Sequence, residues 1–579
     1  MRDPLPCPAT MLRRLAASVL LLVAAAALAG AAPAAAAAPI MPLGEVQPGM
    51  RCTGLSVVRG LEISSFDVEI VDVVPGDPIA RQPLLLVTVS GPAIDPTGIA
   101  SGFSGSPIVC DGRIAGAIAY GTGDYGNQLG LATPIEAMLG QPVPEPPDLE
   151  PEPAVGRARP LATPIAIGGV APAVLNAFAR AAARAGLPLQ AVPAAPAGDR
   201  FPPQQLAPGS SVSVGLASGD VSAGAIGTVT YVDGAKVYAF GHAFAGTGRR
   251  SLLLQDAWVH TVIDNPLGVD PAVSAKLASP GHDLGTITYD GRNGVNGVVG
   301  PVPPRTELRI VARNAATGAR DEATAQVADE AAVGLPDGAS PLPLVAPVAV
   351  AQAAYALLDG SPASQSARMC AAIKLRELPR ATRFCRRYVG QFGGGGTVGG
   401  PYVTDLADAL ALIDGFPYGV PHVTAVDVDL SVEPGLRQAL LLGVRGPRVL
   451  RRGTTATLTL SLQRYRGERF TRRVPLRVPR DAPLGPRMIR LTGTALDGAV
   501  SSEEIEIVIG RRADDDGGAS GPETFAGLAR RIAAMNGWDG VRVAFRRADG
   551  RGGGKTRRLY RDPDVRISGN AAYLARIVR

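Results

Sequence analysis

A serine between two glycines is the residue of this chain best suited to chemistry. Ser104 lies in the segment Gly-Phe-Ser-Gly-Ser-Pro, residues 102–107, which is flanked by apolar runs. Because glycine adopts positive φ without steric cost, a tight loop here can turn the serine hydroxyl outward and aim successive amides inward. A nucleophile beside converging N–H groups is what an acyl-transfer enzyme needs. The alternative is a glycine-rich turn between two buried strands, because short motifs give many false positives.

One of the four histidines has a position suited to a general base. His242 follows Gly241 at the end of a predicted hairpin, whose turn is marked by Asp233-Gly234. A neutral imidazole there can take the proton of Ser104 and return it to a leaving amine. The other three have no such context and are expected to be structural: His260, His282 and His422.

The sequence around both residues resembles a known family. Residues 102–108, Gly-Phe-Ser-Gly-Ser-Pro-Ile, resemble the Gly-Met-Ser-Gly-Ser-Pro-Ile signature of the SpoIVB-type sporulation serine peptidases. Three neighbouring segments also look like the family: 66–71 like its upstream strand, 111–117 like its following hairpin, and 130–139 like the end of its serine half. Residues 227–242 resemble the strand that leads to the family's Gly-His, and 285–297 the end of its histidine half.

The resemblance implies a chymotrypsin-like double β-barrel, with a serine half at 41–140 and a histidine half at 209–315. It also implies Ser104 as nucleophile, His242 as base, and the amides of Gly102 and Ser104 as the oxyanion hole. In the family the histidine half comes first, so the halves are swapped here. Triads are defined by geometry and tolerate such changes of chain order. We therefore expect the two halves to pack against each other.

The third member of the triad departs from the family pattern. The family has an aspartate in a Thr-Asp-Pro segment, and the matching stretch here places Gly91 at that position. Asp95 is the nearest substitute, and Asp256 and Asp264 are further candidates. Ser104 with His242 favours an exported serine endopeptidase acting on proteins or peptides. Gly91 favours the alternative, an inactive envelope binding or scaffold protein that retains the fold.

The N-terminal segment predicts export. Residues 1–38 combine Arg13-Arg14, an apolar run over 15–28 and an alanine-rich end, as in a signal peptide. An uncleaved anchor is the alternative, but we expect cleavage near 38–41. The mature protein would then be periplasmic, in the cell envelope or extracellular. No later stretch predicts a membrane span, because the apolar run 346–358 is too short.

The cysteines agree with export. After the signal four remain, and in an oxidising compartment they can form two disulfides. Of three possible pairings, the local one joins Cys52 with Cys110 and Cys370 with Cys385. No cysteine or histidine spacing predicts a metal site, and we expect no cofactor. The formal charge of +6 over 579 residues is too small to predict nucleic-acid binding, and nothing indicates an oligomeric state.

The length of 579 residues predicts three to five domains. The 71 glycines and 52 prolines favour turns and short strands, which predicts a mainly β protein. Residues 141–208 are expected to be a Pro/Ala-rich linker with a short helix. Residues 316–392 are expected to be largely helical, with helices over 345–358 and 366–389. Alternating strands predict a β-sandwich-like module at 401–510, ending in a strand over 505–509, and 522–579 would form a small α+β module.

Overall fold

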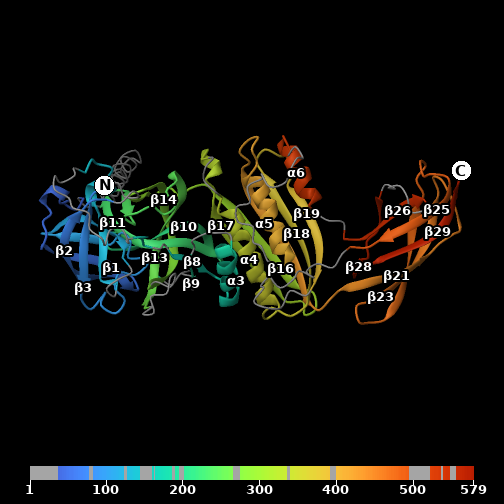
Figure 1. Ribbon diagram of the computed structural model, residues 1–579, viewed down its shortest axis with the longest axis horizontal. Coiled ribbons are helices and arrows are strands. Elements are labelled where there is room, and N and C mark those ends of the chain that lie inside the picture. Colours follow the sequence, from blue (N-terminus) through green and yellow to red (C-terminus); the bar gives the residue numbers. More distant parts are fainter. Residues whose placement is uncertain are drawn as a thin grey trace, which may run out of the picture.

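The computed structural model of the chain is mainly β, with 54% of the described residues in strands and 14% in helices. It is elongated, with two barrels at one end, a helix-covered sheet in the middle and a sandwich at the other end (Figure 1). The structure describes these residues: 37–76, 82–122, 127–143, 159–161, 164–184, 190–194, 201–264, 274–335, 340–390, 400–494, 522–535, 539–547 and 556–579. Residues 1–36 of the predicted signal peptide and the strand expected over 505–509 lie outside them.

The first barrel is a closed antiparallel ring of six strands. Their order is β4-β1-β2-β3-β6-β5, and β4 pairs with both β1 and β5. A two-residue strand, β7 (Arg159–Pro160), pairs with β5, and two short helices flank the ring, η1 (Leu43–Glu45) and α2 (Ile135–Met138). The ring strands are β1 (Arg51–Arg59), β2 (Glu62–Val74), β3 (Leu84–Ser90), β4 (Pro107–Cys110), β5 (Arg113–Gly121) and β6 (Leu129–Pro134).

Buried and exposed residues alternate along those ring strands that have only one face toward a core. In β2, Phe66, Val68 and Ile70 point into the barrel core while their neighbours are exposed. β3 and β5 are buried nearly throughout, as their continuous apolar runs predict. The predicted disulfide between Cys52 on β1 and Cys110 at the end of β4 is present.

The second barrel pairs six further strands in a ring of order β10-β13-β14-β15-β12-β11, all antiparallel, with β11 returning to β10. Its strands are β10 (Ser211–Gly219), β11 (Ser222–Asp233), β12 (Lys236–Ala239), β13 (Gly248–Ile263), β14 (Ala275–Gly291) and β15 (Gly294–Val299). The segment expected as a linker adds β8 (Pro164–Gly168), α3 (Pro172–Arg184) and β9 (Gln190–Ala194) to this barrel through β11.

The two barrels are joined by backbone hydrogen bonds. Gly60 and Val259 bond to each other through both amides, at 2.6 and 3.1 Å. The amide of Ser101 donates to Ser274 at 2.7 Å, and the amide of Thr228 donates to Ser104 at 2.8 Å. The double-barrel fold and the packing of the two halves are therefore as predicted.

A sheet in the middle of the molecule continues from the second barrel. Its strand β17 pairs with β10, and the order onward is β16, β20, β18 and β19. Helices α4 and α5 pack together against it, and α6 lies beside β19 (Figure 1). The elements are β16 (Arg305–Asn314), β17 (Arg320–Ala328), η5 (Ala331–Val333), α4 (Leu342–Leu357), β18 (Gln365–Leu375), β19 (Thr382–Gly390), α5 (Pro401–Asp414), β20 (Val423–Pro434) and α6 (Phe525–Ala534).

The structure corrects the helix expected over 366–389, which is the hairpin of β18 and β19. Buried Ala367, Met369 and Ala371 alternate with more exposed neighbours, which is the period of a strand, and Pro379 falls between the two strands. Cys370 stands directly opposite Cys385 in this hairpin, so the second predicted disulfide is also present. The helix expected over 345–358 is α4.

The C-terminal sandwich has two sheets. The first has the order β24-β23-β21-β28 and the second β22-β29-β25-β26-β27, with an apolar core between them. Their strands are β21 (Gln438–Arg445), β22 (Val449–Arg451), β23 (Thr455–Arg464), β24 (Arg469–Arg477), β25 (Gly485–Thr492), β26 (Val541–Arg547), β27 (Thr556–Tyr560), β28 (Arg566–Ser568) and β29 (Asn570–Val578).

The sandwich boundaries differ from those expected at 401–510 and 522–579. Residues 401–434 form α5 and β20 of the middle sheet, because their apolar residues complete its core. Strands after residue 540 complete the sandwich by pairing with β21, β22 and β25, so they are no separate module. Among the described residues, no helix is long and apolar enough to cross a membrane.

Candidate active site

The serine loop lies against the second barrel. Gly102 and Gly105 have φ of 95° and 91°, which is the glycine-favouring backbone expected on either side of Ser104. A Cβ on Gly105 would lie 2.0 Å from the carbonyl oxygen of Thr228 on β11 and 2.4 Å from the amide nitrogen of Phe240. Glycine is required here because the loop meets the other barrel backbone to backbone.

Ser104 is fully buried, with 0% of its surface exposed. Its carbonyl accepts the amide of Thr228, which fixes the loop on β11. Its Oγ has no hydrogen-bond partner among the described residues. Within the same part of the chain, the amides of Gly102 and Ser104 donate no hydrogen bond, whereas those of Phe103 and Gly105 bond to Ala100 and Ile118.

A strained turn leads from β12 to His242. Phe240 has φ of 73°, which a bulky residue rarely adopts, and Gly241 follows with φ of 68°. The Phe240 ring is buried where a Cβ on Gly227 would lie 2.1 Å from a ring carbon. Strain of this kind persists only where the surroundings enforce it, and it gathers at functional sites.

His242 is buried, and its two ring nitrogens differ. Nδ1 lies 2.7 Å from the carbonyl oxygen of Ala243, whereas Nε2 has no partner among the described residues. Because a carbonyl only accepts, Nδ1 must carry the hydrogen, which leaves the lone pair on Nε2. Burial lowers the pKa of His242, mainly by desolvation, so the ring is neutral near pH 7.

A carboxylate that sequence reasoning missed shapes the loop after His242. The buried Asp290, at the end of β14, accepts the amides of Phe244, Ala245 and Gly246 at 2.7–2.9 Å. Its negative charge also acts on His242, partly opposing the lowering of the histidine pKa. Asp290 is 48 positions further along the chain, and no local pattern marks it as a partner of this loop.

The carboxylates considered for the triad lie elsewhere. Asp95 is exposed, and its Oδ1 accepts the amide of Gly91 at 2.7 Å within the turn after β3. Asp256 is bonded to the amide and ring of His282, and Asp264 accepts the Ser274 hydroxyl at 3.4 Å. In this structure the atom that orients the His242 ring is a backbone carbonyl oxygen.

A buried lysine is hydrogen-bonded to the residues that hold the serine loop. Lys276 on β14 is 0% exposed, and its Nζ donates to Ser56 Oγ at 2.8 Å and to Thr228 Oγ1 at 3.1 Å. Thr228 Oγ1 in turn donates to the carbonyl of Gly102, and Ser106 Oγ donates to Ser56. Burial lowers the pKa of Lys276 to about 7, with desolvation as the cause. Sequence reasoning missed this residue too.

Ser104 and His242 therefore share the interface of the barrels without contacting through a hydrogen bond. A Cβ on Gly105 would lie 2.4 Å from the amide nitrogen of Phe240, two residues before His242. That amide donates to the carbonyl of Thr228 at 3.3 Å, and the amide of Thr228 on β11 donates to the carbonyl of Ser104. The Oγ of Ser106, within the same motif, donates a hydrogen bond to Ser56 Oγ. No group of metal-binding side chains is found among the described residues.

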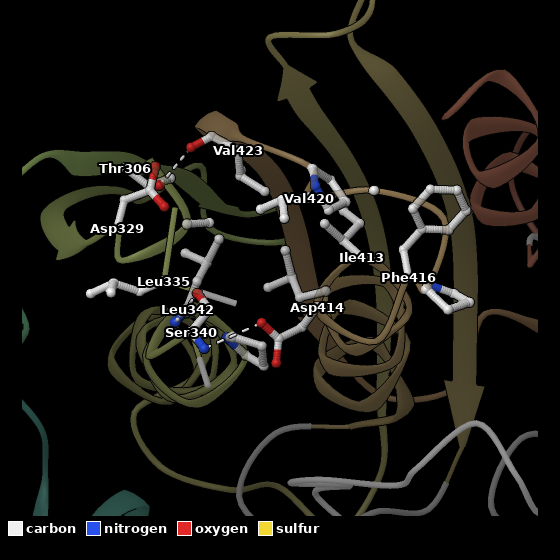
Figure 2. A pocket seen from close by; sticks show the side chains of 16 residues that line it. Thr306, Asp329, Leu335, Ser340, Leu342, Ile413, Asp414, Phe416, Val420 and Val423 are labelled. Atoms are coloured by element: carbon white, nitrogen blue, oxygen red, sulfur yellow. Dashed lines mark hydrogen bonds between the residues drawn. The ribbon is translucent and has the colours of Figure 1, made fainter. Parts of the chain in front are cut away.

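A cavity of about 260 Å³ lies away from this site, between η5, α4, α5 and the segment before β20. Figure 2 shows Asp329 and Asp414 at its edge among mainly apolar side chains. Burial raises the pKa of both carboxyls. None of its lining residues belongs to the serine or histidine loop.

The fold is a pair of six-stranded antiparallel barrels, with Ser104 and His242 both buried between them. Residues 31–139 match the family model of the SpoIVB peptidase S55, which covers the barrel that carries Ser104. This confirms the predicted resemblance to SpoIVB-type peptidases at family level. The matched segment ends before the histidine half, so the swapped order of the halves stays a prediction. No curated protein and no solved structure matches the chain.

Proposed function

We propose that this chain is an exported serine endopeptidase in which Ser104 attacks and His242 is the base. The observation that carries the proposal is a pair of buried side-chain atoms without partners, Ser104 Oγ and His242 Nε2, at one barrel interface. Native proteins leave few buried polar atoms unpaired, and such atoms call for an explanation. One such explanation is a nucleophile and a base whose hydrogen bonds form only when a substrate is bound.

In the mechanism that we propose, each of these groups has one role. The lone pair on Nε2 takes the hydroxyl proton as Ser104 Oγ bonds to the carbonyl carbon of the peptide. The amides of Gly102 and Ser104 donate to the oxygen that becomes negative. His242 then gives its proton to the leaving amine, and water hydrolyses the acyl-enzyme by the same steps. Ala243, held in place by the loop that Asp290 orders, keeps the proton on Nδ1.

Substrate access requires movement at the barrel interface, because Ser104 is fully buried. A peptide must displace the side chains that cover Ser104 before the hydroxyl can reach its carbonyl. We therefore expect a low basal rate for the isolated protein. The two disulfides suit an oxidising compartment, which agrees with the expected export.

Proteolysis by the mature protein tests the proposal. Cleavage of an unfolded protein substrate should be lost to a similar level in Ser104→Ala, His242→Ala and the double variant, because members of one catalytic unit are not additive. Ser106→Ala is the matched control and should keep most activity, since its hydroxyl serves only Ser56. Equal cleavage by Ser104→Ala and the wild type would refute the proposal.

An inactive binding protein is the second candidate, favoured by the buried serine and by Gly91 at the position of the family aspartate. It predicts no cleavage by the wild type with an intact fold. Binding of a peptide without cleavage, measured by calorimetry, would decide in its favour.

A further inference from the structure

The C-terminal part of the chain carries a large excess of positive charge. Residues 436–579 hold 29 lysines and arginines against 14 aspartates and glutamates, a net charge of +15, whereas the chain as a whole has +6. All but one of these basic residues are arginines. The remainder of the chain is therefore negative, and the excess belongs to the end that holds the sandwich.

One face of the sandwich concentrates this charge. In the five-stranded sheet, Ile489, Leu491, Val543 and Ile577 point into the core, so the alternate residues point outward. We call these outward residues the arginine face. Its exposed basic members are Arg451, Arg490, Arg542, Arg558 and Arg576, whereas Arg546 on the same side of β26 is half-buried. No aspartate or glutamate occupies an outward position on the described strands of this sheet.

Apolar side chains lie among these arginines. Leu574 is 55% exposed and stands opposite Met488, and Val449, also 55% exposed, stands beside Arg576. The sheet is thus a broad surface on which guanidinium groups surround an apolar patch. No aromatic side chain that could stack on nucleic-acid bases occupies its outward positions on the described strands.

We propose that the arginine face docks the protein on a membrane surface rich in anionic phospholipid. Guanidinium groups match lipid phosphates in geometry and charge. Leu574 and Val449 can enter the boundary between headgroups and acyl chains, which a soluble polyanion does not offer. The proposal does not rest on peptidase activity, because none of these residues belongs to the site between the barrels.

Vesicle co-sedimentation of the full mature chain tests this. We expect binding to vesicles of phosphatidylcholine with about a third phosphatidylglycerol, weak binding to pure phosphatidylcholine, and loss of binding at high salt. Because each arginine near such a surface contributes about fivefold in the partition coefficient, the Arg490→Glu/Arg542→Glu variant should bind about 25-fold more weakly or worse.

A matched control places the same charge change on the other sheet. Arg473 and Arg477 are exposed on β24, outside the arginine face. Arg473→Glu/Arg477→Glu should therefore retain most binding. Equal losses in the two variants, or no binding by the wild type, would overturn the proposal. Circular dichroism and thermal melting of each variant exclude unfolding as the cause.

A second variant separates lipid from a soluble polyanion. Leu574→Ser/Val449→Ser leaves the charge unchanged and should weaken vesicle binding several-fold, while leaving binding to inorganic polyphosphate as it was. If this variant binds vesicles as the wild type does and polyphosphate competes fully, the face recognises a polyanion, and the lipid proposal is wrong.

Discussion

Ser104 and His242 are held by groups far apart in the chain. Thr228 fixes the serine loop, Asp290 orders the loop after the histidine, and Lys276 joins Ser56 to Thr228 beneath the loop. The local motif of glycines and serine was readable because its backbone requirements are local. Lys276 and Asp290 were not, since their roles depend on barrel closure and long-range pairing.

Burial of Lys276 predicts a specific pH dependence of stability. Its pKa falls from an ordinary 10.5 to about 7 on folding, so between these values the unfolded chain binds more protons. The lysine therefore costs stability near pH 7, and this cost disappears as pH rises toward 10.5. Lys276→Met removes the effect, so the free energy of unfolding of the wild type should rise relative to the variant between pH 7 and 10.

Urea unfolding of both proteins at several pH values measures this difference, in which the other titrating groups cancel. Lys276→Arg is a useful companion, because an arginine stays charged and should be less stable throughout. If the free energies of unfolding of the wild type and Lys276→Met differ by the same amount at every pH in this range, the pKa of Lys276 is not lowered on folding, and the prediction is wrong.

Asp290 should matter for both stability and the histidine loop. Asp290→Ala leaves three part-buried amides without their acceptor and should cost about 1–3 kcal/mol. It should also slow the reaction of Ser104, because the Ala243 carbonyl is no longer held. Thermal melting and single-turnover acylation measure the two effects. Asp95→Ala is the control, and a larger rate loss there would restore Asp95 as the orienting carboxylate.

At the scale of elements, alternation predicted the barrel strands well but did not distinguish the hairpin over 365–390 from a helix. The many alanines and arginines of this segment favour a helix. The segment forms strands because β18 pairs with β20, which makes every second residue face the core. The boundary expected at residue 401 was also wrong, because β20 joins β16 in parallel across more than 100 residues.

The two disulfides should differ in their contribution to stability. They close loops with sequence separations of 58 and 15 residues. Loop-closure entropy gives about 4 kcal/mol for the longer loop and about 3 kcal/mol for the shorter. Cys52→Ala/Cys110→Ala should therefore lower the unfolding free energy of its domain more than Cys370→Ala/Cys385→Ala does. Denaturant titration of both variants checks the order, and the reverse order would show that chain entropy does not decide it.

At the scale of the whole molecule, the barrels bury the reactive serine while the far end presents the arginine face. This separation allows each part to be tested alone.

The pH dependence of the reaction at Ser104 is a property of the two barrels. Because burial lowers the pKa of His242, more of the ring is neutral at pH 6.5 than in an ordinary histidine, which is half protonated there. Acylation of Ser104 should thus persist below pH 6.5 and fall only in more acidic solution.

The most direct measurement is reaction of the mature protein with a fluorophosphonate, followed by peptide mass spectrometry. The account predicts a single phosphonyl adduct on Ser104, slow to form because the serine is buried, present in Ser106→Ala and absent in His242→Ala. An adduct on Ser106 or elsewhere, or no adduct on a folded wild-type protein at any pH between 6 and 9, would contradict it.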